Sequence, residues 1–146
     1  MADFNSRFKS ARQDWTTPLS LFEPLNEEFQ FSLDAAASAE NALAEKFFTE
    51  EDDGLQQCWG GHVVWCNPPY GSKSSKTKDW VIKAYNESVR CGATVVMLIP
   101  ARTNTAWFQD YCLAKAEVRF VRGRPKFGDS KHGLPLPLAI VVFRSP

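Results

Sequence analysis

The hydrophobic pattern of this chain alternates between strand-like runs and helix-like spacing. Residues 93–100 (ATVVMLIP) are continuously apolar, as expected for a strand that is covered on both faces. Residues 78–91 instead place apolar side chains at intervals of three and four, which predicts an amphipathic helix that ends at Gly92. Alternation of this kind predicts an open α/β sheet whose central strands are parallel.

The remaining elements continue this alternation. Further strands are expected over residues 29–34, 62–67, 116–121 and 138–144. Further helices are expected over residues 14–29, where Thr-Thr-Pro opens the helix, and over residues 41–48 and 102–115. The last two strands have no helix between them, which predicts an antiparallel pair at one edge of the sheet. Residues 14–146 are therefore expected to form one domain after an N-terminal tail of residues 1–13.

Three of the expected strands end in polar or rigid residues. Asp34 ends one strand, Asn67-Pro68-Pro69-Tyr70 ends another, and Pro100 ends a third. Because ligands of such sheets bind beyond the carboxyl ends of the strands, these residues are expected along one rim. Small residues, beginning with Ala35, follow Asp34 and would let a helix N-terminus approach a nucleoside-type cofactor. The alternative is that Asp34 only caps a helix.

The two prolines end their strand abruptly, because they remove two backbone donors and fix two φ angles. This elbow presents the amide oxygen of Asn67 and the freed carbonyl of Pro68, with the ring of Tyr70 as a stacking surface. Two acceptors that converge on one point suit a planar NH₂ group and localise the lone pair of its nitrogen. The pattern therefore favours alkylation of an exocyclic amine or amide nitrogen, catalysed by positioning and acceptor dipoles.

The length and composition of the chain are typical of a globular protein. The chain has 146 residues, of which 44% are hydrophobic, so a single core is expected. The N-terminus is polar and no apolar run approaches the ~20 residues of a membrane span, so neither a signal peptide nor a membrane partner is expected. The chain has no Cys-x-x-Cys pair, so we expect no metal site. The cysteines are expected to be buried and reduced, as is usual in the cytoplasm. The four cysteines are Cys58, Cys66, Cys91 and Cys112.

The net charge of zero hides an uneven distribution. Residues 1–55 contain 4 Lys and Arg against 12 Asp and Glu, whereas residues 56–146 contain 13 against 5. The C-terminal part is therefore expected to present a basic face to a polyanion, although unevenly solvated patches would give the same totals. Thr103 would either contact the polyanion or open a helix. The expected contacts lie in or beside three loops and comprise Lys73, Lys76, Lys78, Arg102, Thr103, Arg119, Arg122, Arg124 and Lys126.

The Asn-Pro-Pro-Tyr sequence after a strand resembles the catalytic motif of S-adenosylmethionine-dependent amino-methyltransferases. Ordered blocks over about residues 14–143 resemble the small phage-type DNA adenine-N6 methyltransferases: DWTTPLSLF, FSLDAAASAENA, FFTEEDDGLQQCW, VVWCNPPYG, LIPARTNTAWF and GRPKF. The resemblance implies a single-domain Rossmann-like methyltransferase fold, S-adenosyl-L-methionine as cofactor, DNA as substrate and, for a phage-encoded protein, the host-cell cytoplasm as location. The implied reaction methylates the exocyclic amine of an adenine flipped out of the duplex.

The same resemblance implies a role for each matching position. Thr17-Pro18 matches the segment that holds the methionine carboxylate of the cofactor. Asp34-Ala35 matches the position beside the methionine and ribose, and Asp53 matches an acceptor for the cofactor's adenine amino group. Asn67-Pro68-Pro69-Tyr70 would hold and stack the flipped adenine, with Asn67 also beside the cofactor. Asp53 would alternatively belong to a solvated acidic loop, in which Asp52 is a competing acceptor.

The chain departs from the family pattern in the loop after the first strand. The usual glycine-rich signature is replaced by Ala35-Ala36-Ala37-Ser38, residues that do not adopt positive φ as cheaply as glycine. Only 32 residues separate Asp34 from Asn67, which predicts a sheet trimmed by one strand.

Two alternatives to this function remain. The same mechanism would serve an RNA base or a protein glutamine, and a methyltransferase-like module would bind DNA without catalysis. The basic C-terminal part disfavours a protein substrate, and the intact Asn-Pro-Pro-Tyr and Thr-Pro segments disfavour a loss of catalysis. The sequence predicts neither the target site on DNA nor the oligomeric state.

Overall fold

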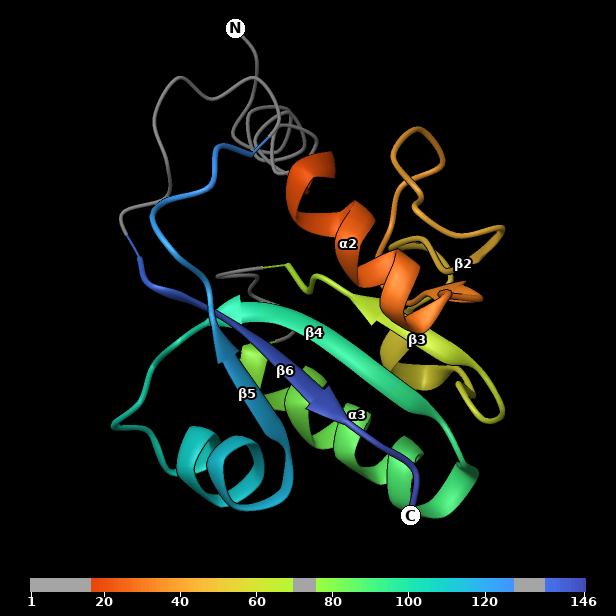
Figure 1. Cartoon of the computed structure of the whole chain (residues 1–146). Helices are drawn as coiled ribbons and strands as arrows, with labels where there is room; N and C mark the ends of the chain where they lie inside the picture. The colour runs from red at the N-terminus through yellow and green to blue at the C-terminus, as the bar shows by residue number, and fades with distance from the viewer. Residues whose placement is uncertain (1–16, 70–75, 128–135) are drawn as a thin grey trace, which may run out of the picture.

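The computed structural model describes residues 17–69, 76–127 and 136–146. Within this part of the chain, six strands form one sheet in the order β2-β1-β3-β4-β6-β5 (Figure 1). The pairs β2–β1, β1–β3 and β3–β4 are parallel, and β6 runs antiparallel to both of its neighbours. The predicted mixed sheet with a parallel centre and an antiparallel C-terminal pair is therefore confirmed. The strands are β1 (Leu33–Asp34), β2 (Lys46–Phe47), β3 (Val63–Cys66), β4 (Thr94–Pro100), β5 (Glu117–Phe120) and β6 (Leu138–Phe143).

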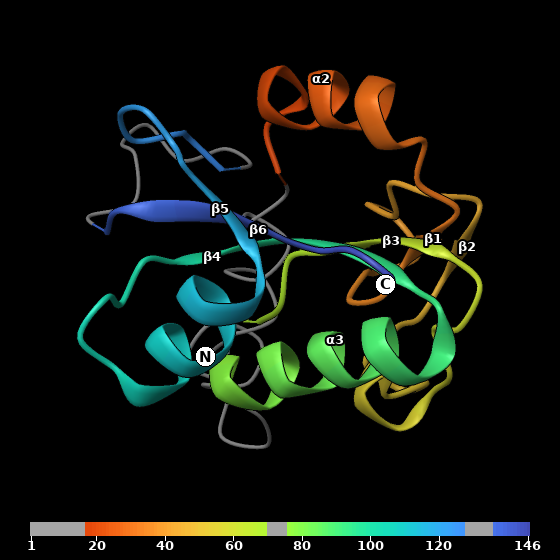
Figure 2. The same ribbon diagram turned by 60° about the horizontal axis from the view of Figure 1, so that its bottom comes forward.

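Helices cover both faces of this sheet. α2 (Leu19–Phe29) lies on one face, and α3 (Thr77–Cys91) lies on the other together with the π-helical segment η2 (Phe108–Leu113) (Figure 2). A short 3₁₀ turn, η1 (Gly54–Gln56), precedes β3. At the start of α3, the Asp79 carboxylate accepts from the backbone N–H of Lys76 at 3.0 Å. α3 ends at Cys91, and the next residue, Gly92, has a φ of 73° and forms the left-handed cap, so the predicted stop is confirmed.

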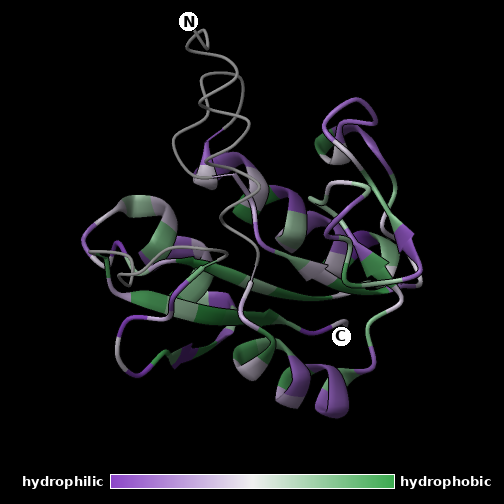
Figure 3. Cartoon of the chain, turned by 90° about the horizontal axis from the view of Figure 1, so that it is seen from above, coloured by the Kyte–Doolittle hydropathy of each residue, from purple (hydrophilic) through white to green (hydrophobic). Residues whose placement is uncertain are grey.

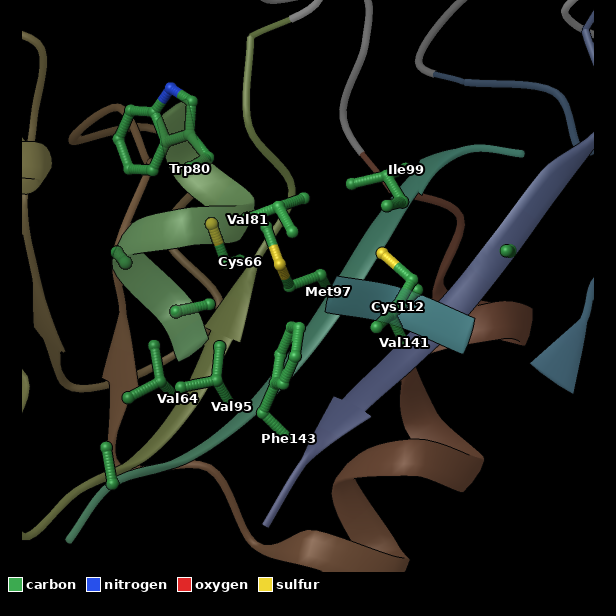
Figure 4. Close-up of a cluster of buried hydrophobic side chains, with 14 of the residues drawn as sticks. Val64, Cys66, Trp80, Val81, Val95, Met97, Ile99, Cys112, Val141 and Phe143 are labelled. Atoms are coloured by element: carbon green, nitrogen blue, oxygen red, sulfur yellow. The ribbon is translucent and has the colours of Figure 1, made fainter. Parts of the chain in front are cut away.

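β4 supplies side chains to both layers of the core. Val95, Met97 and Ile99 pack on the side of α3, and Figure 4 shows them among the buried side chains of that layer. Val96 and Leu98 pack on the side of α2. The hydrophobic colour in Figure 3 is correspondingly concentrated on the central strands. Full burial of a Val, Leu, Ile or Met side chain contributes about 1.5–3 kcal/mol to the free energy of unfolding. These five residues therefore make β4 the centre of the core.

The helix expected over residues 41–48 is a wrong prediction. This segment contains the short strand β2, which pairs in parallel with β1. The backbone N–H of Phe48 donates to the carbonyl of Asp34 at 3.0 Å, and that of Ala37 donates to the carbonyl of Phe48 at 2.9 Å. An eight-residue helical pattern is too short to be stable alone, so pairing with β1 decides the conformation.

Three other predicted elements begin several residues later than expected. The helix expected over residues 14–29 begins at Leu19, directly after Thr17-Pro18. The strand expected over residues 29–34 begins only at Leu33, because α2 runs through Phe29 and Gln30 then adopts a left-handed φ of 58°. The helix expected over residues 102–115 begins at residue 106. The hydroxyl of Thr105 accepts from the backbone N–H of Phe108 at 3.3 Å, which satisfies a donor of the first turn.

The cysteines divide into two groups. Cys66 and Cys112 are buried as predicted, and burial raises the pKa of the Cys112 thiol to about 12. Cys58 and Cys91 are exposed, so the prediction of burial is wrong for this pair. Cys91 is the last residue of α3 and its thiol donates to the Glu87 carboxylate at 3.3 Å, outside the packed layers. All four cysteines are free thiols.

Three further expectations concern the N-terminal tail, a membrane-spanning helix and a metal site. The expected tail, residues 1–13, lies outside the described residues. Among residues 17–69, 76–127 and 136–146, no helix combines the length and the apolar character that crossing a membrane requires. Over the same residues, no three His, Cys, Asp or Glu side chains gather as a metal site would need.

Candidate functional site

The carboxyl ends of the parallel strands lie at one edge of the sheet. Asp34 of β1 is in register with Trp65 of β3, and Trp65 is in register with Val96 of β4. Asp34, Asn67 and Pro100, which end or follow these three strands, therefore lie along one rim, as the sequence predicts. Trp65 packs in the layer on the side of α2. Because residues opposite each other in a sheet point to the same face, Asp34 also points to the side of α2.

Asp34 is almost completely buried, with 3% of its surface exposed. Its carboxylate accepts from the backbone N–H of Leu43 at 3.0 Å and from that of Ala36 at 3.3 Å. Burial raises the pKa of this carboxyl from 3.8 to about 6, because desolvation outweighs the two backbone donors. No helix starts after Asp34, so both the helix-cap alternative and the expected helix N-terminus at this point are wrong. Asp34 instead fixes the turn that follows β1.

Ser38 lies in this turn and was not among the predicted site residues. Its hydroxyl oxygen is buried and has no hydrogen-bond partner among the described residues. Its backbone N–H donates to the side chain of Asn41 at 2.8 Å, which holds the turn in shape. A buried hydroxyl without a partner is uncommon in native structures and indicates a place for a further polar group. The only signal in the sequence is a serine at the end of an alanine run.

Asp53 is exposed and begins η1 with a left-handed φ of 56°. Its carboxylate accepts from the backbone N–H of Leu55 at 3.3 Å. The competing Asp52 accepts instead from both the N–H and the hydroxyl of Thr49, at 2.9 and 3.0 Å. Asp53 thus keeps more of its acceptor capacity than Asp52.

The turn at Asp53 touches the turn after β1. A Cβ atom on Gly54 would lie 2.2 Å from the carbonyl oxygen of Ala35, so the two backbones are in direct contact. The indole N–H of Trp59 donates to the carbonyl of Gly54 at 2.9 Å and holds η1 in this position. The structure therefore brings Ala35, which follows Asp34, into contact with Gly54, which follows Asp53, although 18 residues lie between the two aspartates in the sequence.

The Thr-Pro and Asn-Pro-Pro segments also meet. The side-chain N–H of Asn67 donates to the hydroxyl of Thr17 at 3.1 Å. Thr17 is buried, with 4% of its surface exposed, and Pro18 begins α2 by accepting from the N–H of Leu21 and that of Phe22. Asn67 is half-buried, Pro68 is buried and Pro69 is half-buried; Tyr70 lies outside the described residues. β3 ends at Cys66, directly before this elbow, as predicted.

The predicted polyanion contacts gather at the same edge of the sheet. β5 is antiparallel to β6, which is antiparallel to β4, so β5 ends at the edge where β4 ends (Figure 1). Three exposed groups follow these carboxyl ends: the start of α3, the loop after β4 and the loop after β5. They comprise Lys76, Lys78, Arg102, Thr103, Arg122, Arg124 and Lys126; Lys73 lies outside the described residues.

Arg119 does not belong to this basic edge. Its guanidinium makes two hydrogen bonds of 2.7 Å to the carboxylate of Glu28 and a further bond to Glu117. Bidentate pairing of this kind ties β5 to the C-terminal end of α2. The prediction that Arg119 faces a polyanion is therefore replaced by a structural role.

Comparison with known proteins identifies the family of this chain. A family model described as DNA N-6-adenine-methyltransferase (Dam) matches residues 5–135. A DNA N-6-adenine-methyltransferase of Escherichia phage T1 is 34% identical over 114 residues, which are 77% of this chain and 46% of that protein. One of Haemophilus phage HP1 is 35% identical over 111 residues, 75% of this chain and 61% of that protein. The chain thus spans about half to three fifths of these relatives. The resemblance seen in the sequence blocks is confirmed, and the chain belongs to the DNA N-6-adenine-methyltransferase (Dam) family.

Proposed function

We propose that this protein is an S-adenosyl-L-methionine-dependent DNA methyltransferase that acts on N6 of adenine. Family membership supports this reaction, and it is a proposal for this chain because the chain spans only part of its relatives. The observation that carries the proposal is the meeting of Thr17, Asp34 and Asn67 at one edge of the sheet. These are the residues to which the resemblance assigns the cofactor and the target amine.

The order of the strands supports a Rossmann-like cofactor site. From β1 the chain goes to β2 on one side and then to β3 on the other, so the order reverses between β1 and β3. Ligands of open α/β sheets bind at such a point, outside the carboxyl ends of the two strands. Asp34 and Asn67 flank it. Residues 48–62, between β2 and β3, contain no further strand, which supports a sheet trimmed by one strand.

The residues present fit the proposed cofactor. Within the described part of the chain, each oxygen of the Asp34 carboxylate accepts one backbone N–H, and a carboxylate oxygen can accept a second bond, so the group can accept from amino or hydroxyl donors of the ligand. The hydroxyl of Ser38, which no described residue bonds, fits a polar ligand beside the same turn. Asp53 would accept from the adenine amino group, and Thr17-Pro18 would hold the carboxylate. When bound, S-adenosyl-L-methionine supplies an electrophilic methyl group on a sulfonium.

The elbow after β3 provides the acceptors for the target amine. Pro68 removes a backbone donor, so this part of the elbow can only accept. The side-chain oxygen of Asn67 and the carbonyl of Pro68 would each accept one N6 hydrogen, and Tyr70 would stack on the base. Holding both hydrogens directs the nitrogen lone pair toward the methyl group. A base-paired adenine cannot reach a site below this rim, which is why base flipping belongs to the proposal.

A methyl-transfer assay tests the function directly. The protein is incubated with tritiated S-adenosyl-L-methionine and either duplex DNA, RNA or a protein extract, and the labelled product is digested and identified. Label in N6-methyladenine of DNA is the expected result, and Asn67→Ala serves as the inactive control. Label confined to RNA or protein would contradict the proposal in favour of another substrate, and no label in any arm would indicate a non-catalytic module.

Cofactor affinity should depend on pH through Asp34. The pKa of this carboxyl is raised to about 6 in the free protein, so the group is largely neutral at pH 5. If the cofactor donates to the carboxylate, binding must release this proton, and affinity falls as pH falls. We expect the dissociation constant for S-adenosyl-L-methionine to rise about tenfold from pH 7 to pH 5, since each unit below the pKa costs a factor of about ten.

Titration calorimetry at pH 5, 6, 7 and 7.5 measures this dependence. Asp34→Asn is the matched control, because its amide does not titrate and its affinity should be nearly constant over the same range. A wild-type dissociation constant that stays constant from pH 5 to pH 7 would exclude Asp34 from the cofactor contacts.

The exposed lysines at the start of α3 should contact DNA phosphates. Replacing Lys76 and Lys78 together with glutamine should weaken binding equally on target and non-target DNA, because phosphate contacts carry no sequence information. The slope of log affinity against log salt concentration should become shallower by about 0.9 for each phosphate that is no longer neutralised. Fluorescence anisotropy over a salt series measures both quantities.

The chain offers a matched control for these two lysines. Arg90, at the end of α3, and Lys115, which precedes β5, are exposed at the opposite edge of the sheet. Their double glutamine variant has the same net charge as the lysine variant and should bind DNA almost as the wild type does. Equal reductions of affinity in both variants would mean that only the overall charge matters.

A further inference from the structure

The side-chain amide of Asn67 can turn either its oxygen or its NH₂ group toward the substrate, whereas the two oxygens of a carboxylate are equivalent. The two ends of its side-chain amide have nearly the same shape but opposite hydrogen-bonding properties. If the NH₂ group pointed to the target amine, two donors would oppose each other. The proposed reaction therefore requires something that keeps the oxygen of Asn67 turned toward the substrate.

Thr17 is the group that meets the other end of this amide. The side-chain N–H of Asn67 donates to the Thr17 hydroxyl at 3.1 Å. A hydroxyl can donate as well as accept, but in the proposed site the Thr17 hydroxyl would donate its proton to the methionine carboxylate of the cofactor, so toward Asn67 it can only accept. The bond therefore leaves the Asn67 oxygen unused by Thr17 and turned away from it. Thr17 is 4% exposed, so water does not compete freely for its hydroxyl.

Both partners of this bond are held stiffly. Each precedes a proline, Pro18 or Pro68, and a residue before proline is restricted to extended backbone conformations. Thr17 is also β-branched, which restricts its side-chain rotamers. The carbonyl of Pro18 accepts from two N–H groups at the start of α2, at 3.0 and 3.1 Å, and so anchors the segment to the helix.

We propose that Thr17 is a positioning residue, which fixes the side-chain amide of Asn67 with its oxygen toward the target amine. This inference rests on the proposed function and adds a second role for Thr17 to its proposed contact with the cofactor carboxylate. It predicts that the need for Thr17 disappears when position 67 carries a carboxylate, because the two oxygens of a carboxylate are equivalent.

A double-mutant cycle tests the inference. At saturating cofactor and DNA, Thr17→Val should lower kcat about tenfold, the value of one hydrogen bond, whereas Thr17→Ser should retain most of it. In an Asn67→Asp background, adding Thr17→Val should change kcat less than twofold. Such non-additivity is expected of residues that act through each other. Equal reductions of kcat by Thr17→Val in both backgrounds would overturn the inference, because a merely structural threonine would behave in that way.

A second measurement does not require activity. The side-chain amide signals of Asn67 in a ¹⁵N–¹H NMR spectrum can be assigned by their absence from Asn67→Asp. They should shift in Thr17→Val and remain close to their wild-type positions in Thr17→Ser; unchanged signals in Thr17→Val would overturn the inference. If Asn67→Ala retains turnover, the proposed function itself fails. If Asn67→Ala is inactive but Thr17→Val has full kcat, only the role of Thr17 fails.

Discussion

Asn67→Ala should reduce methyl transfer to DNA by about 10²–10³-fold, the loss that follows removal of one acceptor or donor aimed at a reacting group. The variant lacks the amide oxygen that would hold one N6 hydrogen, while the carbonyl of Pro68 still holds the other. Asp34 and Asp53 are unchanged, so the dissociation constant for S-adenosyl-L-methionine should stay within about a factor of two to three. Asn67 is half-buried and outside both layers of the core, so folding should be preserved.

Single-turnover methyl transfer with tritiated cofactor separates chemistry from product release in this experiment. Asn67→Asp is the informative companion, because a carboxylate is also an acceptor and should retain part of the activity. Titration calorimetry with the cofactor and thermal unfolding are run on each variant. Wild-type turnover by Asn67→Ala would exclude the proposed mechanism, whatever the other variants do.

The edge that carries Asn67 was predictable because its signals are local. Two prolines end β3 wherever it lies, and Asp34 stands directly after the apolar Leu33 at the end of β1. Once the central strands are taken as parallel, their carboxyl ends share an edge without further information. The long runs of β4 and α3 were predictable for the same reason, since their periodicity extends over many residues.

The contacts across this edge were not predictable, because they depend on how distant segments pack. Thr17 and Asn67 are 50 positions apart, and their hydrogen bond exists only because α2 packs on the face to which Trp65 points. The segment 41–48 has helical spacing, but its backbone pairs with β1, a partner that its own sequence does not reveal. Tertiary pairing overrides local propensity in short segments of this kind.

The contact between Gly54 and Ala35 was likewise not predictable, since nothing in the sequence indicates that these two residues touch. Gly54→Ala should destabilise the fold by about 1–3 kcal/mol, the usual cost of forcing an extra methyl group into a packed site. The new Cβ would lie 2.2 Å from the backbone oxygen of Ala35 and 3.1 Å from the ring of Trp80. A backbone carbonyl cannot move aside as a flexible side chain can, so the turn after β1 and η1 must separate.

Separation of these two turns should also weaken S-adenosyl-L-methionine binding, because it moves Asp53 relative to Asp34 and Ala35. Thermal unfolding and titration calorimetry on Gly54→Ala measure the two effects. Gly61→Ala is the matched control: Gly61 has a positive φ of 75° and no atom within 4 Å of a Cβ atom, and it lies before β3, away from the carboxyl edge. Backbone strain should cost this control about 1–2 kcal/mol with unchanged cofactor affinity. If Gly54→Ala is destabilised like Gly61→Ala but binds the cofactor as the wild type does, the contact between the two turns does not shape the cofactor site.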